Sequence, residues 1–177
     1  MHPASHLALS WLCGHRLPDR RDRILVAWAG MAPDIDAASI LFGLEAYGKW
    51  HHVLAHGLFA ALVVSAAAGA AAVKRSTTAA SAFLAFHVHL LTDLFGSGPA
   101  WPIVYLWPVS EKETFGPIAW ALNSWQNVVM TIVALAAIGF IGVTKGRTFA
   151  ESFLPARLDR AVVEALRLRF APVRPER

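Results

Sequence analysis

The stretch Trp125–Val143, WQNVVMTIVALAAIGFIGV, decides the class of fold. It contains no charged side chain, and the basic residues Lys145 and Arg147 follow it closely. A helix needs about 20 predominantly apolar residues to cross the hydrocarbon core of a bilayer. The stretch therefore predicts a transmembrane helix and, with it, an integral membrane protein.

The composition of the whole chain supports the same class. The 177 residues are 56% hydrophobic and only 16% charged, and the mean hydropathy is +0.46. Soluble proteins average roughly 25% charged residues. Seven tryptophans fit the aromatic belts found at membrane interfaces. A single cysteine, Cys13, excludes an internal disulfide and a cysteine-rich metal site.

Other apolar stretches complete an all-α, integral-membrane bundle of about four spanning helices. Val53–Val73 and Thr77–Phe95 both approach spanning length. Ile24–Gly43 also has the length but carries a proline and two aspartates at its centre. We therefore expect it to be a first span that is broken at Pro33–Asp36. Met1–Gly14 is too short to cross and predicts a short N-terminal helix.

The basic residues predict the orientation and the domain organisation. With four spans and a cytoplasmic N-terminus, all of the 16 Lys and Arg residues lie in inside segments except Lys49 and Lys112. The positive-inside rule then places both termini in the cytoplasm. Residues 1–145 form the predicted membrane-embedded domain, and 146–177 form a cytoplasmic or interfacial tail. Its stretch Ala150–Phe170 predicts an amphipathic helix. Because the basic residues flank spans, the pattern excludes nucleic acid as a partner.

Histidine and aspartate residues interrupt the apolar stretches. A charged side chain at mid-bilayer costs roughly 2.5–3.5 kcal/mol, so each such aspartate needs a compensating partner. His52 and His56 are four residues apart and would share one face of a helix, as would His89 and Asp93. An i,i+4 pair of this kind offers two ligands to one metal ion.

In the four-span arrangement, three separate segments bring such side chains to one depth of the membrane. The proline before Asp34 and Asp36 predicts a turn that aims both carboxylates at one point. The residues themselves predict a ligand set of Asp34, Asp36, His51, His52, His56, His89 and Asp93. Imidazole with carboxylate suits Zn²⁺, with Mn²⁺ or another first-row ion as alternatives. Several carboxylates would support one or two ions.

The order of five short motifs resembles a known family. The motifs are His6 in the N-terminal apolar helix, PDID at Pro33–Asp36, HHVLAHGL at His51–Leu58, HVHLLTDLFGS at His87–Ser97 and LWP at Leu106–Pro108. They are similar to those of membrane-bound, metal-dependent hydrolases of the bacterial inner membrane, described as regulated by the LexA repressor. The resemblance implies an inner-membrane location and bound metal, and it adds His6 to the metal ligands. The family's histidine after the aspartate pair is replaced here by Ala37.

The leading hypothesis is an integral-membrane hydrolase that acts through metal-activated water. The motif style is similar to that of zinc-dependent phospholipase C, which implies a phosphoester or phospholipid substrate and a membrane lipid as partner. Asp36 is the expected general base, and His52 is a further ligand or a donor to the leaving group. The loop Gly96–Trp125, with its four tryptophans, would form the rim of the site. A homo-oligomer is compatible with the sequence.

Two other classes of function remain. In an ion or metal relay or transport protein, buried aspartates and histidines mark a pathway through the bundle. In a haem-binding membrane protein, two histidines such as His56 and His89 serve as axial ligands. Haem would leave the aspartates unexplained.

Overall fold

A computed structural model describes residues 1–171, and within them the fold is helical. Along the chain the helices are α1 (Pro3–Gly14), α2 (Arg20–Ala29), the 3-10 helix η1 (Ala32–Phe42), α3 (Leu44–Trp50), α4 (Leu58–Ala71), α5 (Arg75–Gly96), α6 (Trp125–Lys145), the 3-10 helix η2 (Phe149–Ser152) and α7 (Ala156–Phe170). Strand-like pairing in the described residues is limited to an isolated bridge between Ile103 and Thr114. The predicted all-α class is confirmed for this part of the chain.

Two helices, α5 and α6, are long and apolar enough to cross a membrane. They match the predicted spans Thr77–Phe95 and Trp125–Val143 to within a few residues. Helices α2 and η1 reach spanning length and hydropathy only when they are taken together, and they are bent by 47° relative to each other. At 14 residues, α4 is apolar but short. The four predicted spans are therefore not confirmed: residues 1–171 contain two helices of spanning length and hydropathy, or three candidate spans if the bent pair counts as one.

The break in the first predicted span lies earlier than expected. α2 ends at Ala29 and η1 begins at Ala32, so the chain bends at Gly30 and Met31 and not within Pro33–Asp36. Pro33 stands in the first turn of η1, where its missing N–H removes no helical hydrogen bond. Gly30 is required at the bend because a Cβ there would collide with the Ser10 hydroxyl of α1.

The second predicted span also begins later than expected. Residues 51–57 form turns and bends, and α4 starts only at Leu58. His52 has a φ of 70°, a left-handed conformation that a right-handed helix does not contain. The prediction that His52 and His56 share a helix face is therefore wrong.

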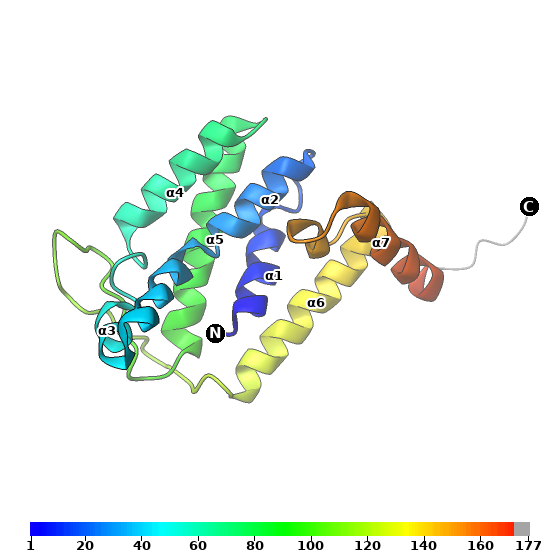
Figure 1. Cartoon of the computed structure of the whole chain (residues 1–177). Coiled ribbons are helices and arrows are strands. Elements are labelled where there is room, and N and C mark those ends of the chain that lie inside the picture. Colours follow the sequence, from blue (N-terminus) through cyan, green and yellow to red (C-terminus); the bar gives the residue numbers. More distant parts are fainter. Residues whose placement is uncertain (172–177) are drawn as a thin grey trace, which may run out of the picture.

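Helix α1 lies at the centre of the bundle (Figure 1). It packs against α2, α5 and α6, while α4 packs along α5. Ala8 and Trp11 of α1 are buried in one apolar cluster with Ala134 and Ile138 of α6. The alanines allow the helix backbones to approach closely, as small residues do in membrane proteins.

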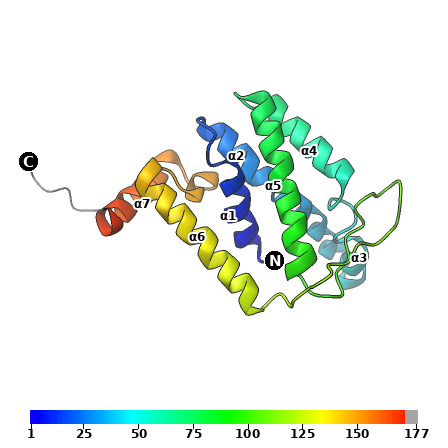
Figure 2. The same cartoon turned by 180° about the vertical axis from the view of Figure 1, so that it is seen from behind.

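The two ends of the bundle differ. Met1, α3 and the loop between α5 and α6 lie at one end, and α7 lies at the other; Figure 2 shows the same arrangement from behind. Arg23 and Arg147 mark the α7 end, where both guanidinium groups donate to the carbonyl of Leu17. At the other end Met1 contacts Asp93, close to the end of α5. Helix α1 thus connects two chemically distinct regions.

The predicted tail packs onto the bundle at its basic end. The expected helix over Ala150–Phe170 is α7, which begins at Ala156, preceded by η2. Glu151 and Ser152 of η2 are buried, and Trp28 of α2 donates to the Ser152 carbonyl. Residues 172–177 of the predicted tail lie outside the described part of the chain.

Candidate metal centre

Eight histidine and aspartate side chains meet at the end of the bundle where Met1 lies. This His/Asp cluster comprises His6, Asp34, Asp36, His51, His52, His56, His89 and Asp93. They come from α1, from η1, from the 51–57 loop and from α5. Asp34 and His51 are half-buried, and the other six are buried. The structure thus brings together all the residues that the sequence predicted for the site.

Asp93 lies at the centre of the cluster. Its Oδ2 atom is 3.0 Å from Nε2 of His89, 3.5 Å from Nε2 of His56 and 3.7 Å from Nε2 of His52. Only 2% of the Asp93 surface is exposed. A carboxylate that is hidden from water therefore faces three imidazole nitrogens from two segments.

The other carboxylate oxygen of Asp93 has polar neighbours of its own. Oδ1 lies 3.1 Å from Nε2 of His6, whose ring stacks on that of His89 with centroids 3.8 Å apart. Oδ1 also accepts hydrogen bonds from the Ser97 hydroxyl and the amino group of Met1. The short helix α1 therefore places His6 beside the cluster, as the resemblance implied.

Several polar atoms of the cluster are buried without a hydrogen-bond partner in the described residues. They include Nε2 of His6, His56 and His89, and Oδ2 of Asp34. A buried polar atom left unsatisfied costs about 1–3 kcal/mol. In folded proteins such atoms are rare and call for a specific explanation. Unpaired nitrogens and oxygens that converge on one point form a donor set for a cation.

The spacing of these atoms suits ligands of one metal ion. Zinc lies about 2.0–2.1 Å from its nitrogen and oxygen ligands, so two ligands of a tetrahedral ion are about 3.4 Å apart. Nε2 of His56 is 3.5 Å from Asp93 Oδ2, and Nε2 of His89 is 3.5 Å from Asp34 Oδ1. Ligand atoms of these four residues all lie within 4.8 Å of one another. The four donors therefore fit a single divalent cation.

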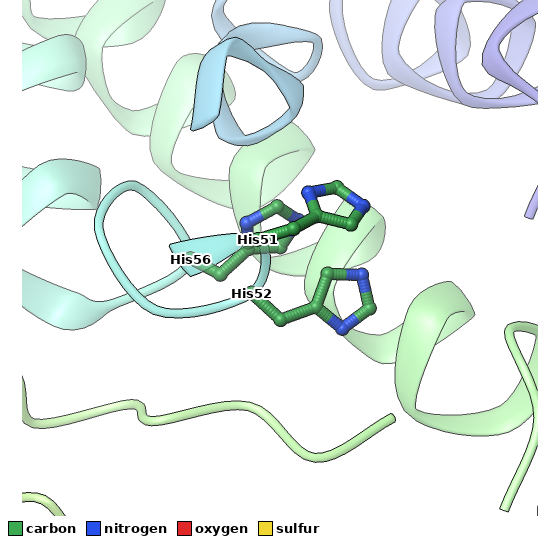
Figure 3. A group of neighbouring side chains, drawn as sticks. All are labelled: His51, His52 and His56. Carbon is green, nitrogen blue, oxygen red and sulfur yellow. The ribbon is translucent and has the colours of Figure 1, made fainter. Parts of the chain in front are cut away.

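A second group of donors adjoins the first. Ligand atoms of His51, His52 and His56 also lie within 4.8 Å of one another. Figure 3 shows their three rings extending from the 51–57 loop to the same side. His56 belongs to both groups. The cluster therefore has donors for one ion or for two neighbouring ions.

Asp36 contacts two histidines of the cluster, His51 and His56, through their Nδ1 atoms. Its Oδ2 lies 2.9 Å from Nδ1 of His56, and its Oδ1 lies 2.7 Å from Nδ1 of His51. An ionised carboxylate only accepts hydrogen bonds, so each Nδ1 donates to Asp36 and each Nε2 points to the other side of its ring. Oδ2 also accepts from the backbone N–H of Ala55. Metal-binding histidines are commonly oriented by a carboxylate in this way.

Long-range backbone hydrogen bonds hold the 51–57 loop in place. The Val104 N–H donates to the carbonyl of His52, and the Leu58 N–H donates to the carbonyl of Tyr105. Gly57 permits this approach, because a Cβ there would lie 2.7 Å from the Tyr105 oxygen. The left-handed φ of His52 is backbone strain of the kind that gathers at functional sites.

The His52 ring carries no charge at neutral pH. Burial away from water lowers the pKa of His52 to about 3, and the nearby His56 ring contributes to the shift. A neutral imidazole is the form that binds a metal ion. His52 is thus a ready ligand.

A cavity of about 150 Å³ opens onto the cluster. Its walls include Asp34, His51, His52 and Asp93, together with Met1, Tyr47, Ser97, Trp101 and Leu122. Ser97, Trp101 and Leu122 belong to the loop that the sequence predicted as the rim, whereas Tyr47 was missed. Tyr47 stands four positions before the predicted residue His51, and that spacing is the sequence signal that would have found it.

Comparison with known proteins identifies one family. The sequence model of a family described as "YdjM inner membrane protein" matches residues 1–163. No curated protein and no solved structure matches the chain. The match covers every residue of the His/Asp cluster and extends into α7.

Proposed function

The chain belongs to the YdjM inner membrane protein family, and on that premise we propose that it is an integral inner-membrane hydrolase whose His/Asp cluster binds a divalent metal. The convergence of unpartnered, buried nitrogens and oxygens carries the proposal. Buried polar groups that serve structure alone are paired with one another. A set left unpaired at one point favours a bound ion. Zinc is the first choice, because imidazole and carboxylate are among its usual ligands.

We assign the ligands from the two donor groups. Asp34, His56, His89 and Asp93 hold one ion, with His6 beside them. His51 and His52, together with the shared His56, provide for a second. The spacing of these atoms supports the metal centre.

We assign separate roles in hydrolysis to the bound ion and to individual residues of the His/Asp cluster. When bound, a zinc-type ion supplies Lewis acidity, which polarises a phosphoryl group and activates water for attack. Oδ2 of Asp34 is unpartnered, and Asp34 lines the cavity, so it accepts the proton of the attacking water. His51 and His52 line the same cavity, and where a single ion is bound they orient the leaving group. Asp36 has both oxygens engaged, which favours a positioning role over that of general base.

A phosphoester of a membrane lipid is the substrate class we favour. The cavity lies beside α3, and the apolar residues around the start of that helix are strongly exposed: Leu41 by 82%, Phe42 by 86% and Leu44 by 79%. Such side chains are at home in lipid, so the site is within reach of a molecule held in the bilayer. The basic end of the bundle faces the cytoplasm in this proposal, by the positive-inside rule. The cavity then opens at the other end.

Neither rival function accounts for the cluster as well. A cavity of about 150 Å³ is far too small for a porphyrin. A relay needs polar groups along a path, but the buried face of α5 before His89 carries Ala82, Ala85 and Phe86, with Thr78 as its polar side chain. Haem would leave the carboxylates around the histidines unexplained.

The test uses two neighbouring histidines of α5. His89 lies in the cluster, whereas His87 bonds to Tyr105 and to the Phe83 carbonyl. Detergent-purified wild type should contain a stoichiometric transition metal and hydrolyse a soluble aryl phosphodiester or phospholipid vesicles. His89→Gln should lose both properties, and His87→Gln should retain them. A metal-free wild type, or a His89→Gln variant with full metal content, would sink the proposal.

A further inference from the structure

A second cavity adjoins the one at the metal centre. It has a volume of about 380 Å³ and shares two wall residues, His51 and Trp101, with the smaller cavity. Its other walls come from the end of α3, from the 51–57 loop and from the segments near residues 100–104 and 113. Lys49 and Glu113 stand on its exposed side. A molecule in this cavity therefore lies directly beside the His/Asp cluster.

The walls of this cavity carry one charge of each sign. Lys49 supplies an ammonium group and Glu113 a carboxylate. Within residues 1–171 neither side chain forms an ion pair. The Lys49 Nζ atom lies 4.8 Å above the Trp50 ring, a cation–π contact that leaves its N–H donors free. Both charges thus remain available to a ligand.

Trp101 adds an aromatic wall to this cavity. The Trp101 indole lines both cavities and stands edge-on to the His51 ring, with centroids 5.7 Å apart. Indole is the best aromatic surface for an organic cation, and quaternary or primary ammonium groups bind to it. A carboxylate and an indole together favour an ammonium group, whereas a lysine favours a phosphate.

We propose that this second cavity binds the zwitterionic phosphate–ammonium headgroup of a membrane phospholipid. The phosphate lies towards Lys49 and the shared wall at His51, and the ammonium group lies between Glu113 and Trp101. This inference rests on the proposed hydrolase function, because it names the substrate class of the same site. The exposed apolar residues Leu41–Leu44 favour a lipid over a free phosphate as the source of the headgroup.

Calorimetry on the purified, metal-loaded full chain tests the proposal with two water-soluble headgroups. Glycerophosphoethanolamine carries both charges, and glycerophosphoglycerol carries the phosphate without the ammonium. An exposed cation–π contact contributes about 0.5–1 kcal/mol, so wild type should bind the zwitterionic compound about two- to fivefold more tightly. Glu113→Gln should reduce this preference, because only the Trp101 contact then remains for the ammonium group, and Lys49→Gln should weaken the binding of both compounds.

The chain offers matched controls for these variants. Glu111 and Lys112 belong to the same exposed loop but do not line the cavity. Glu111→Gln and Lys112→Gln should bind both headgroups as wild type does. The headgroup proposal is overturned if wild type shows no preference, or if Glu113→Gln and Glu111→Gln behave alike.

Metal content and hydrolysis of a soluble aryl phosphodiester separate this proposal from the function on which it rests. If the protein holds metal and hydrolyses the diester but shows no headgroup preference, the headgroup site is wrong and the hydrolase stands. If the preference is present and depends on Glu113 in a metal-free, inactive protein, the headgroup site stands and the hydrolase falls.

Discussion

Two buried polar clusters lie near opposite ends of α1, and they differ in whether their atoms are paired. At the basic end, the Arg23 guanidinium forms two hydrogen bonds with the Glu151 carboxylate and donates to the carbonyls of Leu17 and Pro18. Trp11 also donates to Glu151. At the other end, Nε2 of His6, on the same helix, is buried 3.1 Å from Asp93 Oδ1 but forms no aligned hydrogen bond.

The difference distinguishes a cluster that stabilises the fold from one that is able to bind a cation. Every nitrogen of Arg23 and both oxygens of Glu151 are hydrogen-bonded, so this pair holds α2 and η2 together. The His/Asp cluster keeps unpaired donors at a single point, which in itself destabilises the protein. A cation would offset this cost. The four predictions below test the contrast, from the largest expected effect to the smallest.

Glu151→Gln should have the largest effect, and it should be on stability. Removing the carboxylate charge leaves Arg23, only 6% exposed, without its counter-ion. Breaking one half of a buried ion pair destabilises a protein by about 3–5 kcal/mol. Denaturant unfolding in detergent micelles measures the loss. The double variant Arg23→Met with Glu151→Leu should recover much of it, because no charge is then left unpaired. A Glu151→Gln variant as stable as wild type would show that the Arg23–Glu151 pair does not stabilise the fold.

Added metal should stabilise the wild type. A ligand at 100 times its Kd raises the free energy of unfolding by about 2.7 kcal/mol. Thermal unfolding with and without zinc, after treatment with a chelator, measures the increment. Asp93→Asn should abolish it, whereas Glu151→Gln, although less stable, should keep it. An equal response in Asp93→Asn and wild type would show that zinc acts elsewhere.

Asp36→Asn should weaken metal binding without removing a direct ligand. Asp36 orients His51 and His56, and loss of such a partner lowers metal affinity about 10- to 100-fold. Competition with a chelating dye measures the affinity. Ser39→Ala is the control, because the Ser39 hydroxyl bonds to the Asp36 carbonyl and not to its carboxylate. Unchanged affinity in Asp36→Asn would mean that the two histidines need no orienting partner.

Ser97→Ala should have the smallest effect. The Ser97 hydroxyl donates to Asp93 Oδ1 at 2.7 Å, and one such bond contributes about 0.5–1.5 kcal/mol. Metal affinity should therefore fall about two- to tenfold, by the same dye competition. Ser110→Ala, on an exposed loop, is the control. A loss larger than that of Asp36→Asn would reverse the order of importance within the cluster.

Much of the fold follows from local patterns in the sequence. The long apolar runs predict α5 and α6, because length and hydropathy suffice to predict a spanning helix. The residues of the His/Asp cluster were likewise predictable, since histidine and aspartate in apolar segments require partners. The resemblance to a known family added His6.

The rest depends on contacts between distant segments. Val104 binds the backbone of the 51–57 loop at His52, and Tyr105 binds Leu58 directly after the loop. The local sequence around His52 does not predict these contacts. The bend at Gly30 likewise depends on the close approach of Ser10. Asp36 was predicted as a ligand and general base, but only the three-dimensional arrangement shows its oxygens engaged by two histidines.

X-ray absorption at the edge of the bound metal tests the central claim most directly, because it reports the ligand atoms themselves. For purified wild type we predict nitrogen and oxygen ligands at about 2.0–2.1 Å, with the outer scattering of several imidazole rings. In His56→Ala, whose ring belongs to both donor groups, the metal or most of that imidazole signal should be lost. A wild-type spectrum without imidazole scattering, or one that His56→Ala leaves unchanged, would contradict the account.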